Sequence, residues 1–230
     1  MMRSPEVPDE DGEQPADVAA MLDLIRSEQE RMSRRLAAGV PAILLAWGIA
    51  WFVGFMLLWL IDGARPAIAV PVAVAAIAFA LLMAGAIVVS AVMGARMSRG
   101  IRSAPGAAWT GTVYGLMWPV GFLSLTALGQ ALIVNGMPPE LASIYYPTAS
   151  TIFVGIMYVL AGGIWRNWPS IAMGGWFIVV AEVAPFFGYP THYLVFALAA
   201  GGVFLLGALV AWLWLRESRR RPDDTEDVDE

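Results

Sequence analysis

The chain alternates long apolar stretches with short polar hinges. A helix that crosses the hydrocarbon layer of a bilayer needs about 20 mainly apolar residues. Stretches of this kind occur near residues 40–61, 67–94, 107–134, 148–165, 170–188 and 193–215. The pattern predicts an all-α integral membrane protein with six transmembrane helices.

The positions of the arginines predict how these helices are oriented. Basic residues in short loops stay on the cytoplasmic side of a membrane. Arginine clusters precede the first stretch, follow the second and the sixth, and Arg166 separates the fourth from the fifth, whereas Arg65 alone falls on the opposite face. Six crossings place every cluster on one side, and five or seven crossings do not. We therefore expect a multi-pass protein of the bacterial cytoplasmic (inner) membrane with both termini in the cytoplasm.

The polar ends divide the rest of the chain. We expect residues 1–15 to be a disordered acidic tail, 38–216 to be the transmembrane domain and 217–230 to be a second disordered acidic tail. Residues 16–37 have apolar side chains at alternating steps of four and three, which predicts a cytoplasmic amphipathic helix. This helix is too short to establish a coiled coil. A position on the membrane surface and docking on a cytoplasmic partner are both open.

Two of the apolar stretches share a motif. Residues 47–58 and residues 114–125 both read aromatic-Gly-x-x-Trp-x-Val-Gly-Phe-x-x-Leu, at an offset of 67 residues. The copies lie two spans apart, so they cross the membrane in the same direction. The motif therefore predicts that the first two helix pairs form a parallel repeat of helix hairpins.

The aromatic residues of this motif form a candidate face on each helix. Their spacing places Trp47 and Trp51 on one side of the first span, and Tyr114 and Trp118 on one side of the third. One interpretation is packing, in which a glycine admits a neighbouring helix and the indole fills the space beside it. The other is an aromatic-lined path or ligand pocket between the repeats. Small-residue seams predict further helix contacts within or between subunits at Ala46/Ala50/Gly54, Ala86/Ser90/Gly94 and Gly111/Gly115.

A candidate polar site lies in the fifth span. Glu182 is the one ionisable side chain well inside a predicted span, and such residues are expensive in lipid. Pro185, one turn later, removes a helix N–H, and His192 and Tyr189 follow the next turn and could approach Glu182. This grouping predicts an ion or proton site, with Gln130 as a further candidate. The alternative is that Glu182 stays hydrated near the interface or forms a purely structural hydrogen bond.

Composition narrows the chemistry. The chain is 59% hydrophobic and 14% charged, with a mean hydropathy of +0.66, no cysteine and one histidine. Disulfides and thiolate sites are excluded, and one imidazole cannot supply paired haem ligands. Without a phosphate-binding loop, a nucleophile elbow or a metal-binding helix motif, we expect no enzyme activity and no cofactor. The basic residues are confined to the flanks of the membrane spans, so we expect no nucleic-acid partner.

Two functions fit this architecture, in which the lipid bilayer itself is the first partner. The first is a transport-type protein, a homo-oligomer that moves a small solute or ions along a path between the repeats with Glu182 as its polar centre. The second is a non-catalytic accessory or regulatory subunit that binds a partner membrane or cytoplasmic protein. The internal repeat favours the first, and the scarcity of intramembrane polar groups favours the second.

The stretch Leu45-Ala46-Trp47-Gly48-Ile49-Ala50-Trp51-Phe52-Val53-Gly54-Phe55, together with the overall plan, resembles small six-span membrane proteins of actinobacteria. The resemblance covers most of the membrane body. It implies the six-span plan and supplies no catalytic or binding residues.

Overall fold

Long helices make up the part of the chain that the computed structural model describes, which is residues 20–27, 38–65, 67–68, 70–97 and 105–218. Within these ranges, six helices are long and apolar enough to cross a membrane. The first four are α2 (Val40–Trp59), α3 (Val72–Met97), α4 (Pro105–Val134) and α5 (Pro139–Ile164). The fifth is α6 (Trp168–Val183) with the 3₁₀ turn η1 (Ala184–Phe187), and the sixth joins α7 (Thr191–Val195), the π-helix η2 (Phe196–Gly201) and α8 (Gly202–Ser218). The prediction of six long apolar helices is confirmed.

Two boundaries differ from those expected, and prolines explain both. The fourth helix begins at Pro139 rather than near residue 148, because proline suits the first turn of a helix. The residues that follow include Glu140 and Ser143, which lower the hydropathy of this turn but do not end the helix. The fifth span tightens into η1 around Pro185, which has no N–H for the α-helical bonding pattern.

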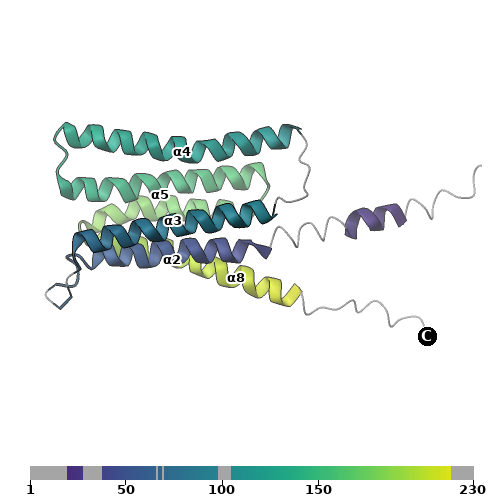
Figure 1. Cartoon of the computed structure of the whole chain (residues 1–230), viewed down its shortest axis with the longest axis horizontal. Coiled ribbons are helices and arrows are strands. Elements are labelled where there is room, and N and C mark those ends of the chain that lie inside the picture. Colours follow the sequence, from purple (N-terminus) through teal and green to yellow (C-terminus); the bar gives the residue numbers. More distant parts are fainter. Residues whose placement is uncertain (1–19, 28–37, 66, 69, 98–104, 219–230) are drawn as a thin grey trace, which may run out of the picture.

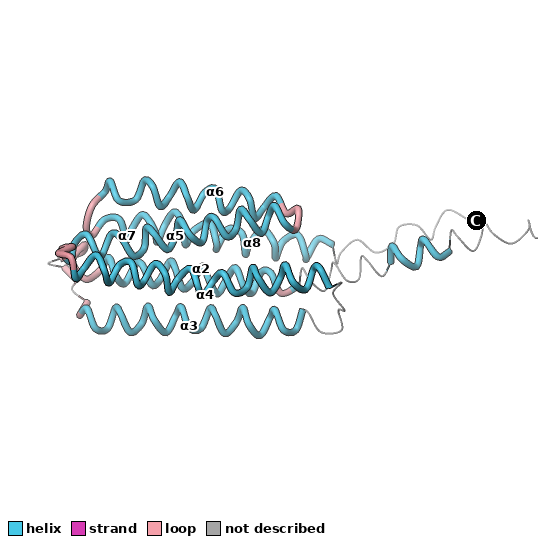
Figure 2. The backbone as a smooth tube through the Cα atoms, turned by 90° about the horizontal axis from the view of Figure 1, so that it is seen from above, coloured by secondary structure: helices cyan, strands magenta, loops and turns pink. Residues whose placement is uncertain are grey.

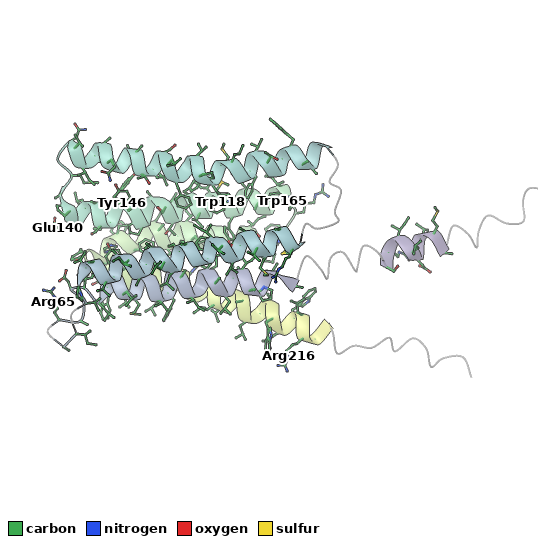
Figure 3. The ribbon with its side chains drawn as sticks, viewed as in Figure 1. Arg65, Trp118, Glu140, Tyr146, Trp165 and Arg216 are labelled. Carbon is green, nitrogen blue, oxygen red and sulfur yellow. The ribbon has the colours of Figure 1, made fainter. Side chains whose placement is uncertain are left out.

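Successive long helices run antiparallel (Figure 1). The start of α2 and the end of α8 therefore lie at the same end of the bundle. Figure 3 shows Trp165 and Arg216 toward this end, and Arg65 and Glu140 at the opposite end. We call these the Arg216 end and the Arg65 end. The chain therefore enters α2 and leaves α8 at the Arg216 end.

The helices differ greatly in how much of their surface is covered. α5 packs extensively on α6, and α2 packs on α3, η2 and α8, whereas α4 packs chiefly on α5. Figure 2 shows α3 and α6 at opposite edges of the bundle. Most side chains of α3 and α4 are exposed in the single chain. These two helices present large apolar surfaces outward, as a lipid environment allows.

Aromatic rings fill the core between α2, α6 and the last span. Phe177 stacks on Trp51 with ring centroids 5.6 Å apart and lies 4.8 Å from the ring of Phe204. Phe55 stacks on Phe196 at 5.3 Å. Phe177, Phe196 and Phe204 are at most 1% exposed. The centre of the described bundle is therefore occupied by tightly packed rings.

The π-helix η2 lies where the last span crosses α2 at very short range. A Cβ atom added to Gly201 would come within 2.6 Å of the backbone nitrogen of Phe52. The indole N–H of Trp176 donates a hydrogen bond to the carbonyl oxygen of Ala199, at 2.9 Å. The irregular turn is thus held by α2 on one side and by α6 on the other.

The segments before α2 and after α8 are described only in part. Residues 20–27 form a helix whose side chains are exposed, with Asp23 and Arg26 paired at 3.6 Å. The rest of the amphipathic helix predicted at 16–37 lies outside the described residues. So do the acidic tail at 1–15 and all of the second tail after Ser218, where α8 ends.

Candidate functional site

Polar side chains gather at the Arg65 end of the bundle. Asp62, just after α2, accepts a hydrogen bond from the hydroxyl of Tyr189 and pairs with Arg65, whose Nε lies 3.2 Å from Oδ1 of Asp62. Burial, followed by the hydrogen bond and the charge of Asp62, raises the pKa of Tyr189 to about 12. The phenol therefore stays protonated at physiological pH and ties the end of α2 to the connection between α6 and α7.

His192 joins α7 to α5. Its side chain is fully buried, with Nε2 3.1 Å from the carbonyl oxygen of Ser143 and Nδ1 3.1 Å from that of Gly188. Pro147, inside α5, has no N–H to give to the Ser143 carbonyl one turn earlier, so the imidazole supplies the missing donor. The Gly188 oxygen already accepts the backbone N–H of His192, at 2.9 Å. These partners favour the tautomer that carries its hydrogen on Nε2.

The structure brings together two of the predicted site residues at this end. The ring centroid of His192 lies 6.2 Å from that of Tyr189 and 4.0 Å from that of Tyr193. His192, Tyr189, Asp62 and Ser143 therefore form one cluster, which we call the His192 cluster. It fastens the starts of α5 and α7 to the end of α2.

Glu182 does not belong to the His192 cluster, contrary to the expectation that His192 and Tyr189 approach it. Both ring nitrogens of His192 face carbonyl oxygens, and the Tyr189 hydroxyl donates to Asp62. Glu182 is exposed on the outer face of α6, whereas its neighbour Ala181 is fully buried against the core. The sequence did not predict that Glu182 points away from the bundle.

Gln130 has a structural partner on the neighbouring helix. Its Nε2 donates to the hydroxyl of Tyr146, at 3.0 Å, and the hydroxyl of Tyr145 donates to the carbonyl oxygen of Leu125, at 2.9 Å. Figure 3 shows Tyr146 between α4 and α5. These bonds join α4 to α5 near the Arg65 end.

In the first copy of the repeated motif, both aromatic side chains serve helix packing. Trp51 is buried in the aromatic core, 5.5 Å from Phe204 and 5.6 Å from Phe55. Trp47 donates its indole N–H to the hydroxyl of Ser90 on α3, at 2.9 Å. Gly54, on the same face, lies against the ring of Phe79.

The second copy makes matching contacts with α5. The hydroxyl of Tyr114 donates to the carbonyl oxygen of Met157, at 3.1 Å, and the ring of Trp118 meets that of Phe153 at 5.8 Å. Both the Trp47 and the Tyr114 bonds reach a residue 43 positions further along the chain. Gly121 lies against Phe153, as Gly54 lies against Phe79. The contacts of both copies are those of the packing interpretation.

The three small-residue seams differ in their contacts. Gly54 and Ala50 in the first seam and Ala86 in the second are buried within the chain. A Cβ added to Gly111 or Gly115 would meet no atom within 4 Å in the described structure. The third seam is therefore not used between the described helices.

The described residues hold no group of three histidine, aspartate or glutamate side chains placed to bind a metal ion.

Residues other than the predicted candidates also build the His192 cluster. The sequence pattern did not lead us to predict three of them as site residues, namely Asp62, Ser143 and Pro147. Two features of the sequence could have found them. Asp62 and Arg65 lie three residues apart in one hinge, and Pro147 leaves the carbonyl oxygen of Ser143 without its helical donor.

Comparison with known protein families, curated proteins and solved structures finds no match to this chain.

Proposed function

We propose that the chain is a non-catalytic membrane subunit that binds a transmembrane helix of a partner protein through the outer face of α6. The observation that carries the proposal is the exposed position of Glu182 on this face. Glu182 belongs to a helix that is long and apolar enough to cross a membrane, and within the hydrocarbon layer a carboxylate on an outer face meets either lipid or another protein.

The surroundings of Glu182 are apolar. Trp176, Val179 and Val183 on the same helix are 45–50% exposed, and Phe186 is 91% exposed. Within the described residues, Glu182 makes no hydrogen bond or ion pair. Charged side chains in transmembrane helices are usually paired within a protein, because a charged side chain at the centre of the bilayer costs about 2.5–3.5 kcal/mol even on insertion scales. A donor on a partner helix, such as an arginine, lysine or amide side chain, removes this cost.

Transport was the other function that the sequence favoured, with Glu182 at the centre of a path between the repeats. Trp51, Phe177 and Phe204 instead fill the space between α2, α6 and α8, and Glu182 lies outside them. Both observations support the subunit role. One observation favours transport: the hydroxyls of Thr148 and Thr151 on α5 are buried and have no hydrogen-bond partner within the described part of the chain, as along a water or ion path. Solute flux into liposomes that Thr151→Val changes would support that role.

The experiment for the subunit role places a photo-crosslinking amino acid at Val179 or Val183 in living cells. We expect one discrete crosslinked product from these positions and none from Leu123, which is 70% exposed on α4. Glu182→Gln should lower the yield about five-fold, as expected for one intramembrane polar contact of roughly 1 kcal/mol. Glu140→Gln, at the start of α5, serves as the matched control and should leave the yield unchanged.

The mass of the product identifies the partner. A product of twice the chain's mass means that the partner helix belongs to a second copy, and another discrete mass means a different protein. Equal labelling from Val179, Val183 and Leu123, or a yield that Glu182→Gln does not change, contradicts the proposal.

A further inference from the structure

A groove opens between α4 and α5 on the side of the Arg216 end. Its volume is about 280 Å³. Val113, Tyr114 and Met117 line it from α4, and Met157, Leu160 and Ile164 line it from α5. Both helices are long and apolar enough to cross a membrane, so in a bilayer the groove lies within or beside the hydrocarbon layer.

The two hydroxyl groups that line this groove are already bonded within the chain. The hydroxyl of Tyr114 donates to the carbonyl oxygen of Met157, at 3.1 Å, and the hydroxyl of Thr110 donates to that of Gly106, at 3.0 Å. Among the residues that the structure describes, no charged side chain lines the groove. A ligand therefore meets an apolar surface, and the two methionines provide flexible side chains that adapt to its shape.

The end of the groove has the features of a membrane interface. Trp109, which also lines it, is 71% exposed, and indole rings concentrate at the level of lipid headgroups. Trp165, at the end of α5, packs edge-on against Tyr114 with ring centroids 4.9 Å apart, and Figure 3 shows it at this end of the bundle. The end of α5 is thus held against the groove.

Arg166 follows Trp165 directly. Its backbone turns at φ 52°, which ends α5, and its side chain is exposed. Within the described residues it makes no ion pair with an acidic side chain. Arg65 at the other end differs in this respect, because it pairs with Asp62 at 3.2 Å. Arg166 leaves a positive charge available two residues beyond Ile164 of the groove.

We propose that this groove is a binding site for an anionic phospholipid, with one acyl chain between α4 and α5 and the phosphate near Arg166. The apolar lining selects a hydrocarbon chain, and the arginine selects a negative headgroup. The inference is independent of the partner proposed for α6, because it concerns different helices and a different ligand.

The test uses the full chain in nanodiscs of phosphatidylglycerol or phosphatidylcholine. Each contains a trace of the same lipid with a photoreactive diazirine in its acyl chain, and labelled peptides are mapped by mass spectrometry. We expect the label to concentrate at Met117, Met157 and Leu160 rather than at Leu123, although Leu123 on α4 is more exposed than any of them, at 70%. Labelling should be about five-fold stronger in phosphatidylglycerol, as expected for roughly 1 kcal/mol per interfacial arginine.

Two variants test the site for the acyl chain and the site for the headgroup separately. Arg166→Gln should bring the ratio between the two lipids close to one, whereas Arg65→Gln should leave it unchanged. Met117→Phe fills the groove from a side chain that is 42% exposed, and should reduce labelling of Met157 and Leu160 but not of Leu123. Equal labelling of Leu123 and the groove, a lipid ratio insensitive to Arg166→Gln, or protein crosslinks that replace lipid at the groove would overturn the proposal.

Discussion

Replacing Gly174 with valine is expected to force α5 and α6 apart. A Cβ atom at this position would lie 2.5 Å from the carbonyl oxygen of Gly155 and 2.8 Å from the backbone nitrogen of Val159. Both atoms belong to the backbone of α5, so no side-chain rotation relieves the clash. Because the contact between α5 and α6 is the most extensive in the bundle, we expect a loss of about 3 kcal/mol or more in the free energy of unfolding.

The adjacent residue provides a matched control. A Cβ at Gly175 would meet no atom within 4 Å, so Gly175→Val should change stability little. Thermal unfolding of the purified protein in mild detergent measures both variants. Equal melting temperatures for the two would show that α5 and α6 do not cross at Gly155 and Gly174.

Truncating Phe177 is expected to have the second large effect. Its ring is fully buried and lies 5.6 Å from Trp51, 5.7 Å from Tyr158 and 4.8 Å from Phe204, so Phe177→Ala removes the centre of the aromatic core. In lipid the unfolded helices remain in an apolar solvent, and the cost comes chiefly from lost ring contacts and the cavity. We expect roughly 3 kcal/mol, the low end of the range for a buried phenylalanine.

Phe186→Ala makes the same chemical change at a side chain that is 91% exposed. It should leave the unfolding transition in detergent close to that of the unchanged chain. If Phe186→Ala destabilises the protein as much as Phe177→Ala does, the aromatic core is not the centre of stability that the structure describes.

The sequence predicted the number and approximate position of the helices because the length of an apolar stretch is set by the thickness of the bilayer. It did not predict which face of each helix is buried. In a soluble helix, polar residues mark the outer face, but in a lipid-exposed helix both faces are apolar. Glu182 illustrates the result, since its place in the fifth long apolar helix followed from the sequence, whereas its outward direction depends on how α6 packs against α5 and η2.

Irregular features of the backbone could be predicted only where a proline marks them. Pro185 signalled the change to the 3₁₀ turn η1, and Pro147 frees the carbonyl oxygen that His192 binds. The π-helix η2 carries no such signal. It depends on the approach of Phe52 to Gly201 and on the hydrogen bond from Trp176, and both are contacts between residues far apart in sequence.

The repeated aromatic motif was open to two interpretations until its partners were known. Trp47 and Tyr114 donate hydrogen bonds to residues of the following helix, and Trp51 and Trp118 pack against rings. Tyr114 has a second role, because it also forms part of the groove between α4 and α5. Spacing along one helix predicts that residues share a face, but only the neighbouring helix decides between contact and groove.

The central proposal is that all six apolar helices cross the membrane and that the Arg216 end lies in the cytoplasm. The sequence contains no cysteine, so single cysteines can be introduced without a background. A membrane-impermeant maleimide applied to intact spheroplasts should label Ala64→Cys and Asn135→Cys at the Arg65 end. It should label Arg166→Cys and Glu217→Cys only after the membrane is permeabilised. Labelling of Arg166→Cys or Glu217→Cys in intact spheroplasts would contradict this topology.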